Sequence, residues 1–577
     1  MKKFLTKHID CFVGALLGVG VFLFWWLGYP QALSYQEQNQ LFLWTGDYFV
    51  NDVRIIGGFA DWLGEFFTQF YYIVWLGAAV LGLIFAVFYI LAVHTIDEYK
   101  LSQSVDSDAP GRFEAASFAL IPVALLLGFM GDECVLLSYV MAIILAMSTF
   151  LLLQFAERKS QTSLWWADIV VVPALYWLAG PMAWLYASLR AIYSNGWKKT
   201  VAPAIMLIVH LLAVRFVLVQ WPLLTAICGT NYYRRFNYVE ELQIIIPAII
   251  AVFAFVMSFR KWTTSSVSPK MMRRACVVTV TAVAAIISFQ GVTKGFEKEK
   301  YELINQDYLI RNERWNDVLA NAEKTVVPVN FWSESVNLSL SMTGQLSNRM
   351  FSFFQSGTDA LIMGMVRDNT SNLPTMEAFY RLGMVNESMR YASDIQESIM
   401  NGKKSGRFTK RIAECCIISG RYEVARKNLD LLEKSLFYRD WAKDAKTYLG
   451  NEAWIDAHPQ WGRLRKFGFK TDFLYNYGEL DKVLGQLFIS NPENKMALEY
   501  FLGQLLLIGD MKSFAQYLSW AQQYGGYPSM PAGYADAWNC IQNHGNVPGS
   551  PFAEYARRLS ASAQQMHNDM EQSESLH

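Results

Sequence analysis

The segment from Tyr29 to Phe70 combines acidic and aromatic residues in a pattern that suits chemistry at a membrane surface. Its carboxylates are those of Glu37, Asp47, Asp52, Asp61 and Glu65. A carboxylate held near a lipid headgroup can act as a general base, or it can bind a cation that neutralises phosphate. Glu37 follows soon after an apolar run and is the strongest catalytic candidate. The alternative is that each acid belongs to the solvated face of an interfacial helix.

Charges of both signs stand elsewhere in the same half of the chain. The pair Arg234-Arg235 suits a phosphate or diphosphate, because guanidinium groups bind such oxygens in a bidentate manner. The pair Asp132-Glu133 forms an acidic turn between two apolar runs. These charges predict either a polar site or simple mutual neutralisation.

Two further polar residues, His210 and Arg215, lie inside the apolar run 201–220. A polar or charged side chain is costly within a bilayer, so both are candidates for substrate or phosphate binding. A structural hydrogen bond to a neighbouring helix is the equal alternative.

Composition and motifs exclude several classes of protein. Lys and Arg together number 50, as do Asp and Glu, so no overall basic charge favours a nucleic-acid partner. The seven cysteines show no metal-ligand or disulfide spacing. No Walker loop, GxSxG, HExxH or dinucleotide fingerprint stands in a supporting context. The identity of any metal is therefore unknown, and a divalent cation is the open possibility.

These candidates must be positioned by membrane helices, because the first half of the chain is a series of apolar runs. A transmembrane helix needs about 20 mostly apolar residues. The sequence predicts about nine spans, at 11–28, 71–94, 115–131, 133–155, 165–180, 182–196, 201–220, 241–259 and 275–291. The long segment 29–70 between the first two is predicted to lie on the membrane as amphipathic pieces broken at Gly57-Gly58.

The basic residues predict the orientation of these spans. With the N-terminus inside, the inner segments carry Lys2, Lys3, Lys7, Lys100, Arg112, Arg158, Lys159, Lys198, Lys199, Arg260, Lys261, Lys270, Arg273 and Arg274. The outer segments carry only Arg54, Arg234 and Arg235. Positive residues favour the cytoplasmic side, so we expect a cytoplasmic N-terminus and a periplasmic tail in a bacterial inner membrane.

The tail is polar and shows helical periodicity, which predicts an all-α protein with a membrane domain at 1–291 and a helical domain at 292–577. Gly420-Arg421-Tyr422, Ala425 and Leu429 match the turn and second helix of a tetratricopeptide repeat. Weaker matches to the same repeat pattern begin at Glu313, Gly383 and Gly509. We expect a tetratricopeptide-like α-solenoid that binds a protein partner, or one that only caps the membrane domain.

The stretches YQEQNQLFLWTGDYF (Tyr35 to Phe49) and GGFADWLGEFFTQFYY (Gly57 to Tyr72) resemble an uncharacterised domain-of-unknown-function family of bacterial polytopic inner-membrane proteins. That resemblance covers the whole chain and implies no activity.

More distantly, the architecture is similar to the GT-C membrane glycosyltransferases. In that class an acid of the first outer loop is the catalytic base or a metal ligand, and the donor is commonly a polyprenyl-linked phosphate. Glu37 and then Asp47 stand where that motif would be, although the paired-acid pattern of the class is missing. The resemblance implies a transferase using a lipid-linked phosphate donor at the outer leaflet. The alternative is a non-enzymatic membrane scaffold, and the sequence leaves open whether the chain is an enzyme.

Overall fold

A computed structural model describes residues 9–98, 112–235, 238–258, 270–399, 402–470, 475–545 and 547–561. Across these ranges the protein is helical without β-strands, and the one extended pairing is an isolated bridge between Val135 and Tyr233. Several basic residues used in the topology prediction lie outside the described residues, namely Lys2, Lys3, Lys7, Lys100, Arg260 and Lys261.

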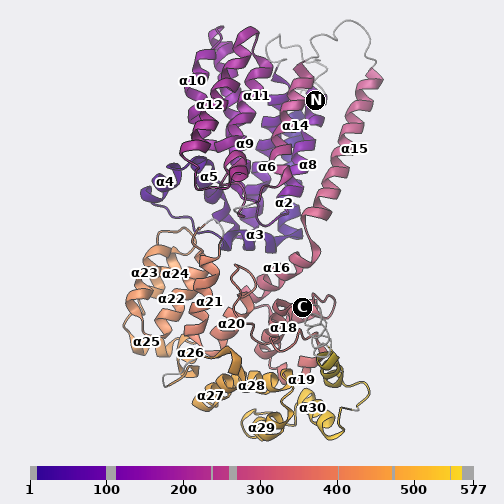
Figure 1. Cartoon of the computed structure of the whole chain (residues 1–577), viewed down its shortest axis with the longest axis vertical. Helices are drawn as coiled ribbons and strands as arrows, with labels where there is room; N and C mark the ends of the chain where they lie inside the picture. Colours follow the sequence, from indigo (N-terminus) through magenta and orange to yellow (C-terminus); the bar gives the residue numbers. More distant parts are fainter. Residues whose placement is uncertain are drawn as a thin grey trace, which may run out of the picture. The chain divides into compact units, whose positions relative to one another are not determined.

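The chain divides into two compact units (Figure 1). The first unit is Met1–Tyr301 together with two short segments, Met400–Lys403 and Lys434–Phe437. The second unit holds Glu302–Ile399, Lys404–Glu433 and Tyr438–His577.

The first unit contains the apolar helices. Seven helical stretches are long and apolar enough to cross a membrane: Ile9–Gly28, Val74–Ile96, Leu137–Ser160, Trp165–Tyr193, Gly196–Phe216, Glu241–Ser258 and Arg274–Gly295. The corresponding helices are α2 (Ile9–Leu23) with a π-helical turn (Phe24–Gly28), α6 (Val74–Ile96), α9 (Leu137–Ser160), α10 (Asp168–Ala179) with α11 (Ala183–Tyr193), α12 (Val201–Phe216), α14 (Glu241–Ser258) and α15 (Lys270–Gly295).

Large apolar side chains cover the outside of these helices. On α12 the exposed residues include Leu207, Ile208, Leu211 and Leu212, and α15 exposes Phe289. Apolar surface of this extent is unfavourable in water but is suited to lipid tails. The first unit therefore has the surface of a membrane protein.

Glycines allow the apolar helices to approach closely. A Cβ added at Gly18 of α2 would lie 2.8 Å from the carbonyl oxygen of Gly82 in α6. A Cβ at Gly295 of α15 would lie 2.1 Å from the carbonyl oxygen of Gly128 in α8 (Leu120–Phe129). Small residues at such crossings are typical of helix packing in membranes, where van der Waals contact drives association.

Two pairs of shorter helices complete the first unit. α7 (Arg112–Phe118) and α8 together form an apolar stretch, Phe113–Phe129, that is shorter than the seven above. The stretch Trp165–Tyr193 is not one straight helix, because a 3-10 turn (Gly180–Met182) separates α10 from α11. Arg190 near the end of α11 bonds Asp168 at the start of α10, so the two helices run antiparallel. The count of nine crossings stays a prediction.

The loop between α2 and α6 is itself helical. It contains α3 (Pro30–Gln38), α4 (Gly46–Val53), α5 (Gly58–Thr68) and a 3-10 turn (Gln69–Tyr72). The predicted break at Gly57-Gly58 is confirmed, since it separates α4 from α5. The outer segment after α12 adds a short helix, α13 (Leu223–Cys228).

The second unit consists of helical hairpins. After α16 (Lys298–Arg311), which begins in the first unit, its helices are α17 (Trp315–Ala322), α18 (Asn330–Met342), α19 (Leu346–Arg349), α20 (Leu373–Leu382), α21 (Val385–Glu397), α22 (Gly406–Ile418), α23 (Tyr422–Leu432), α24 (Arg439–Lys446), α25 (Glu452–Ala457), α26 (Trp461–Phe467), α27 (Leu480–Ser490), α28 (Lys495–Leu507), α29 (Met511–Tyr524) and α30 (Ala532–Gln542). Helices that follow each other pack together from α20 to α23 and from α27 to α29.

The four positions that the sequence marked as repeat turns share one geometry. Glu313, Gly383, Gly420 and Gly509 all have left-handed backbone, with φ of 55°, 82°, 75° and 76°. At each turn the next backbone N–H bonds a carbonyl five residues earlier, as Arg421 does with Cys416 at 2.8 Å. This bond is the Schellman closure of a helix. The turns are those of helical hairpins, while the tetratricopeptide-like solenoid remains a prediction.

Candidate functional site

The loop between α2 and α6 places three carboxylates on two short helices. Thr45 caps α4 by accepting a hydrogen bond from the backbone N–H of Tyr48 at 3.3 Å. Asp52 comes at the end of α4, while Asp61 and Glu65 are one turn apart on one face of α5. All three residues are buried. We call these carboxylates the acid cluster.

Lys403 lies among the three carboxylates of the acid cluster. Its Nζ is 2.8 Å from Glu65 Oε1, 3.1 Å from Asp52 Oδ1 and 3.5 Å from Asp61 Oδ2. The Tyr48 hydroxyl donates a short hydrogen bond to Glu65 Oε2. Lys403 belongs to one of the two short segments that complete the first unit. One ammonium thus faces three acids, and the cluster carries more potential negative charge than the lysine can neutralise.

The surroundings of the acid cluster raise the pKa of two of its carboxyl groups, those of Asp52 and Asp61. Burial raises the pKa of Asp61 to about 7, against the opposing effect of the Lys403 charge. Burial, then the charge of Glu65, raises the pKa of Asp52 to about 6. Burial alone would lower the pKa of Lys403, but the neighbouring carboxylates outweigh it and the net shift is upward. Carboxyl groups with such values can exchange protons near neutral pH.

A second group of charges surrounds Arg234. Its Nη1 donates to the carbonyl of Glu133 at 2.7 Å, and its Nη2 donates to Gln36 Oε1 at 2.9 Å. Gln36 Nε2 also donates to the Glu133 carbonyl, at 3.0 Å. The backbone N–H of Arg234 bonds the Cys134 carbonyl at 2.9 Å. Arg234 is therefore a buried junction between α3, the acidic turn and the segment after α13.

The acidic turn has its own partners. Lys300 Nζ lies 2.8 Å from Glu133 Oε2, and the Tyr233 hydroxyl donates to Asp132 Oδ2 at 2.5 Å. Arg235 is exposed. We call Arg234, Arg235, Lys300, Asp132 and Glu133 the arginine cluster. Glu297 Oε2 also lies 3.9 Å from Lys300 Nζ, so three cations meet three carboxylates here, and exposed Arg235 is the cation of the cluster that a solvent anion can reach.

Asp132, Glu133 and Cys134 are close enough together to share a metal, with ligand atoms within 4.8 Å of one another. Burial and then the Glu133 charge raise the pKa of the Cys134 thiol to about 12. Lys300 Nζ contacts Glu133 and the Tyr233 hydroxyl bonds Asp132, so groups of the protein itself contact both carboxylates.

The chain from Gln36 to Gln40 connects the two clusters. Gln36 belongs to the contacts of Arg234, and Gln40 Nε2 donates to the backbone carbonyl of Glu65 at 2.9 Å. Gly64 lies against the backbone of Ser138 in α9, which fixes α5 on the helical bundle. The clusters are thus linked through one short segment of the loop.

Of the predicted catalytic acids, Glu37 is buried on α3 with only 4% of its surface exposed, next to Gln36, which accepts a hydrogen bond from Arg234. Asp47 is exposed in the first turn of α4, while Asp52 of the same helix faces Lys403.

The two polar residues of α12 have different surroundings. His210 is buried, accepts a hydrogen bond from Trp184 Nε1 at 3.4 Å and packs on Tyr176. Arg215 is exposed at the end of the helix, with its guanidinium 5.5 Å from the ring centre of Phe216. His210 has the contacts of a packing residue, and Arg215 is free to meet a headgroup.

The sequence did not identify two lysines that contribute to these clusters. Lys403 and Lys300 complete the two clusters from positions far along the chain, and nothing in their local sequence indicates it. The spacing of Asp61 and Glu65, which sit one helical turn apart, was the available signal for the acid cluster.

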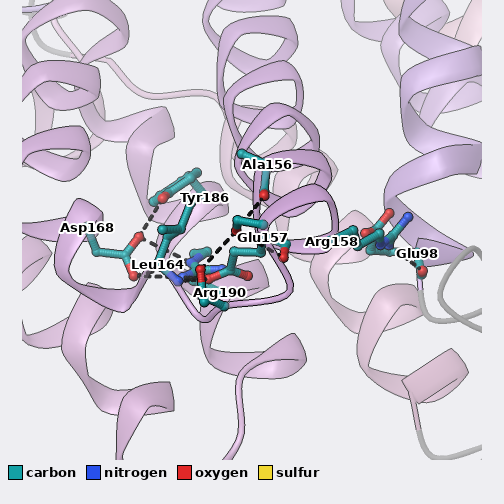
Figure 2. A network of polar contacts seen from close by, with 10 residues as sticks. Glu98, Ala156, Glu157, Arg158, Leu164, Asp168, Tyr186 and Arg190 are labelled. Carbon is teal, nitrogen blue, oxygen red and sulfur yellow. Dashed lines mark hydrogen bonds and ion pairs between the residues drawn. The ribbon is translucent and has the colours of Figure 1, made fainter.

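A third polar network is internal to the apolar helices (Figure 2). Arg190 of α11 bonds both oxygens of Asp168 at 3.1 and 3.2 Å and both oxygens of Glu157 at 3.0 Å. The Tyr186 hydroxyl donates to Asp168 at 2.5 Å. These bonds join α9, α10 and α11. Because the guanidinium of Arg190 bonds two carboxylates at once, it holds the three helices together, and we call this network the Arg190 clamp.

Comparison with known proteins gives a family but no activity. No curated protein and no solved structure matches the chain. Over residues 6–568 the sequence matches the profile of the Family of unknown function (DUF6057), and the chain is a member of that family.

Proposed function

We propose that this membrane protein is a transferase that moves a sugar or related group from a lipid-linked phosphate donor to a lipid, glycan or protein acceptor. The acid cluster carries the proposal. It lies in the loop between the first two long apolar helices, and burial raises the pKa of Asp52 to about 6 and that of Asp61 to about 7. A general base for a hydroxyl acceptor needs this property.

In the proposed step the acceptor oxygen bonds the anomeric carbon of the donor. The bond from that carbon to the phosphate oxygen breaks, and the phosphate leaves with the electron pair. A carboxylate of the acid cluster receives the proton of the acceptor hydroxyl. Exposed Arg235, with Lys300, attracts the phosphate. Glu37 and Asp47 remain alternative bases, while Arg215 suits a lipid headgroup.

The proposal includes a topology. The seven long stretches, the α7–α8 pair and the division of Trp165–Tyr193 into two arms are compatible with nine crossings. With nine crossings and a cytoplasmic N-terminus, the loop and the tail both lie on the periplasmic side of a bacterial inner membrane.

The second candidate is a scaffold without catalysis. It is favoured by the burial of Glu37 and by the hydrogen bonds that buried Arg234 makes to Gln36 and to the Glu133 carbonyl. The hairpins of the tail, stacked as a tetratricopeptide-like solenoid, would then bind a polypeptide on a concave surface.

Transfer is tested in membranes from bacteria that express the full chain. The probes are polyprenyl-phosphate-linked [14C]glucose and [14C]mannose, and the readout is loss of label from the donor. We expect Asp61→Asn to slow turnover by about 100-fold or more, the range for loss of a general base. Glu397→Gln changes an exposed acid of the tail and serves as the control. Turnover equal to that of membranes without the protein would exclude both donors and favour the scaffold.

A further inference from the structure

A cavity of about 620 Å³ lies inside the second unit, near the end of the described chain. Its walls are the turn between α28 and α29, the end of α30, and the helical residues 551–561, which we call the C-terminal helix. Pockets for small organic ligands measure about 300–1,000 Å³. This cavity is therefore large enough for such a molecule.

Hydrogen bonds between the walls keep the cavity in shape. The Tyr555 hydroxyl of the C-terminal helix donates to the Leu507 carbonyl of α28 at 2.8 Å. Ser550, just before the C-terminal helix, donates from its hydroxyl to Asp536 Oδ2 of α30 at 2.8 Å. The cavity is thus formed in advance, and a ligand would not have to spend binding energy on opening it.

The inner part of the cavity is apolar. Its buried lining includes the side chains of Leu506, Phe552 and Ala553. The buried polar atoms of the lining already have partners, because the Tyr555 hydroxyl is bonded as described and Cys540 Sγ lies 3.1 Å from Ser550 Oγ. A polar group of a ligand would lose its bonds to water here without gaining new ones. The part of the ligand that lies inside should therefore be hydrocarbon.

The mouth of the cavity carries one permanent positive charge. Arg557 and His544 line it and are exposed, and no described residue of the lining is acidic. Arg557 Nε donates to the Ala553 carbonyl at 3.3 Å, while within the described ranges its two terminal nitrogens have no partner. The guanidinium of Arg558 instead lies 5.7 Å from the ring centre of Phe354. A guanidinium with two available nitrogens suits a carboxylate, which it binds through parallel hydrogen bonds.

We propose that this cavity binds one long-chain fatty acid, with its alkyl chain against Leu506 and Phe552 and its carboxylate on the guanidinium of Arg557. The apolar interior matches the alkyl chain, and the single charge at the mouth matches one carboxylate. The apolar helices of the first unit suit a bilayer, where amphiphiles of this kind concentrate. The inference does not depend on the proposed transferase activity.

The test uses the full-length protein in phosphatidylcholine nanodiscs, so that no detergent competes for the cavity. The probe is palmitic acid with a photoreactive diazirine in the middle of its chain, and mass spectrometry locates the label. We expect saturable labelling at Ile541 or Phe552, which line the cavity. Excess palmitic acid should remove this label, and hexadecanol, which lacks the charge, should be at least tenfold less effective. Labelling confined to the helices of the first unit, or equal competition by both compounds, would overturn the proposal.

Two neighbouring arginines give a matched pair of variants. Arg557→Gln removes the charge at the mouth, while Arg558→Gln removes an equal charge whose guanidinium lies on Phe354. We expect labelling in the cavity to fall at least tenfold in Arg557→Gln and to stay at the wild-type level in Arg558→Gln. Equal labelling of the two variants would overturn the assignment of Arg557.

A third variant covers the case in which Arg557→Gln does not fold. Ala556 lines the cavity and is half-buried, so Ala556→Trp fills part of the space and leaves the charge at the mouth in place. We expect at most one tenth of the wild-type labelling at Phe552, with a Tm close to that of the wild type. Full labelling of Ala556→Trp would overturn the proposed position of the alkyl chain.

Discussion

Gln36 Oε1 accepts a hydrogen bond from Arg234 Nη2 at 2.9 Å, although 198 positions separate the two residues along the chain. The amide of Gln36 also donates to the Glu133 carbonyl that Arg234 Nη1 bonds. One glutamine and one arginine thus close a three-way contact at the end of the helical bundle. The adjacent Arg235 is exposed and takes no part in it.

Arg234 and Arg235 should therefore contribute differently to the free energy of unfolding. Arg234→Ala removes a buried cation and its hydrogen bonds to Gln36 Oε1 and the Glu133 carbonyl, of which only the carbonyl keeps a donor, Gln36 Nε2, at a cost of about 1.5–3 kcal/mol per charged hydrogen bond. Arg235→Ala should change the free energy of unfolding by less than about 0.5 kcal/mol, as is usual for surface changes. Thermal unfolding of the purified protein measures both. If Arg235→Ala were the more destabilising variant, the junction would be assigned to the wrong residue.

The acid cluster predicts a pH dependence of stability. The pKa of Asp61 rises from 3.8 to about 7 on folding, so the folded protein binds the extra proton between these values. This contribution is complete below pH about 4 and is lost as the pH rises through about 7. Asp61→Asn cannot titrate. We expect its Tm relative to the wild type to rise by a few degrees between pH 5 and pH 8, since one pKa unit corresponds to about 1.4 kcal/mol.

The comparison at each pH removes contributions from groups common to both proteins. Differential scanning fluorimetry in one detergent gives the two Tm values. A difference that stays constant or falls with rising pH would show that Asp61 is ionised throughout.

The Arg190 clamp predicts that a single substitution of Arg190 greatly lowers the stability of the protein. Arg190→Ala leaves the buried carboxylate of Asp168 and the half-buried carboxylate of Glu157 without this cation, and breaking such a buried group costs about 3–5 kcal/mol. Lys159→Ala, at an exposed position of α9, is the control and should have little effect. Thermal unfolding in detergent compares them, and equal Tm values would contradict the clamp.

The turns of the tail predict which of two glycine substitutions lowers the Tm more. Gly420→Ala meets no atom within 4 Å and costs only the left-handed conformation, about 1–2 kcal/mol. Gly383→Ala bears the same strain, and its Cβ would also lie 2.6 Å from Cβ of Phe467 and 2.9 Å from the Leu464 carbonyl oxygen. We expect the lower Tm for Gly383→Ala. The reverse order would mean that α26 is free to move away from the turn.

The proposed topology is tested with reporters fused after Glu299. Alkaline phosphatase, which works in the periplasm, should be active there, and green fluorescent protein, which fluoresces in the cytoplasm, should be dark. The opposite pair of results would place the tail in the cytoplasm and move both clusters to the other face of the membrane.

The helices of the first unit were predictable because each is a long apolar run whose length the bilayer sets. The run 241–259, for example, corresponds to α14 at Glu241–Ser258. The repeat turns were predictable because a left-handed position favours glycine, as at Gly420. Glu313 adopts the same conformation without being glycine, and only its place in the repeat indicated it.

The site was less predictable because it depends on tertiary contact. The sequence ranked Glu37 above Asp52 from its distance to the first span; both are buried in the structure, and Lys403 approaches Asp52. Pairing between residues hundreds of positions apart leaves no local signal. The partners of Arg234 likewise could not be deduced from spacing, and its role in phosphate binding stays a prediction.

The α10–α11 hairpin has short arms. The 12 residues of α10 rise about 18 Å at 1.5 Å per residue, against a hydrocarbon core of about 30 Å. Trp166 and Trp197, near the open end of the hairpin, are exposed and suited to the headgroup region. In the proposed nine-crossing topology each arm crosses the membrane, so lipid beside these helices must thin to match them, and shorter-chain lipids would relieve this local mismatch.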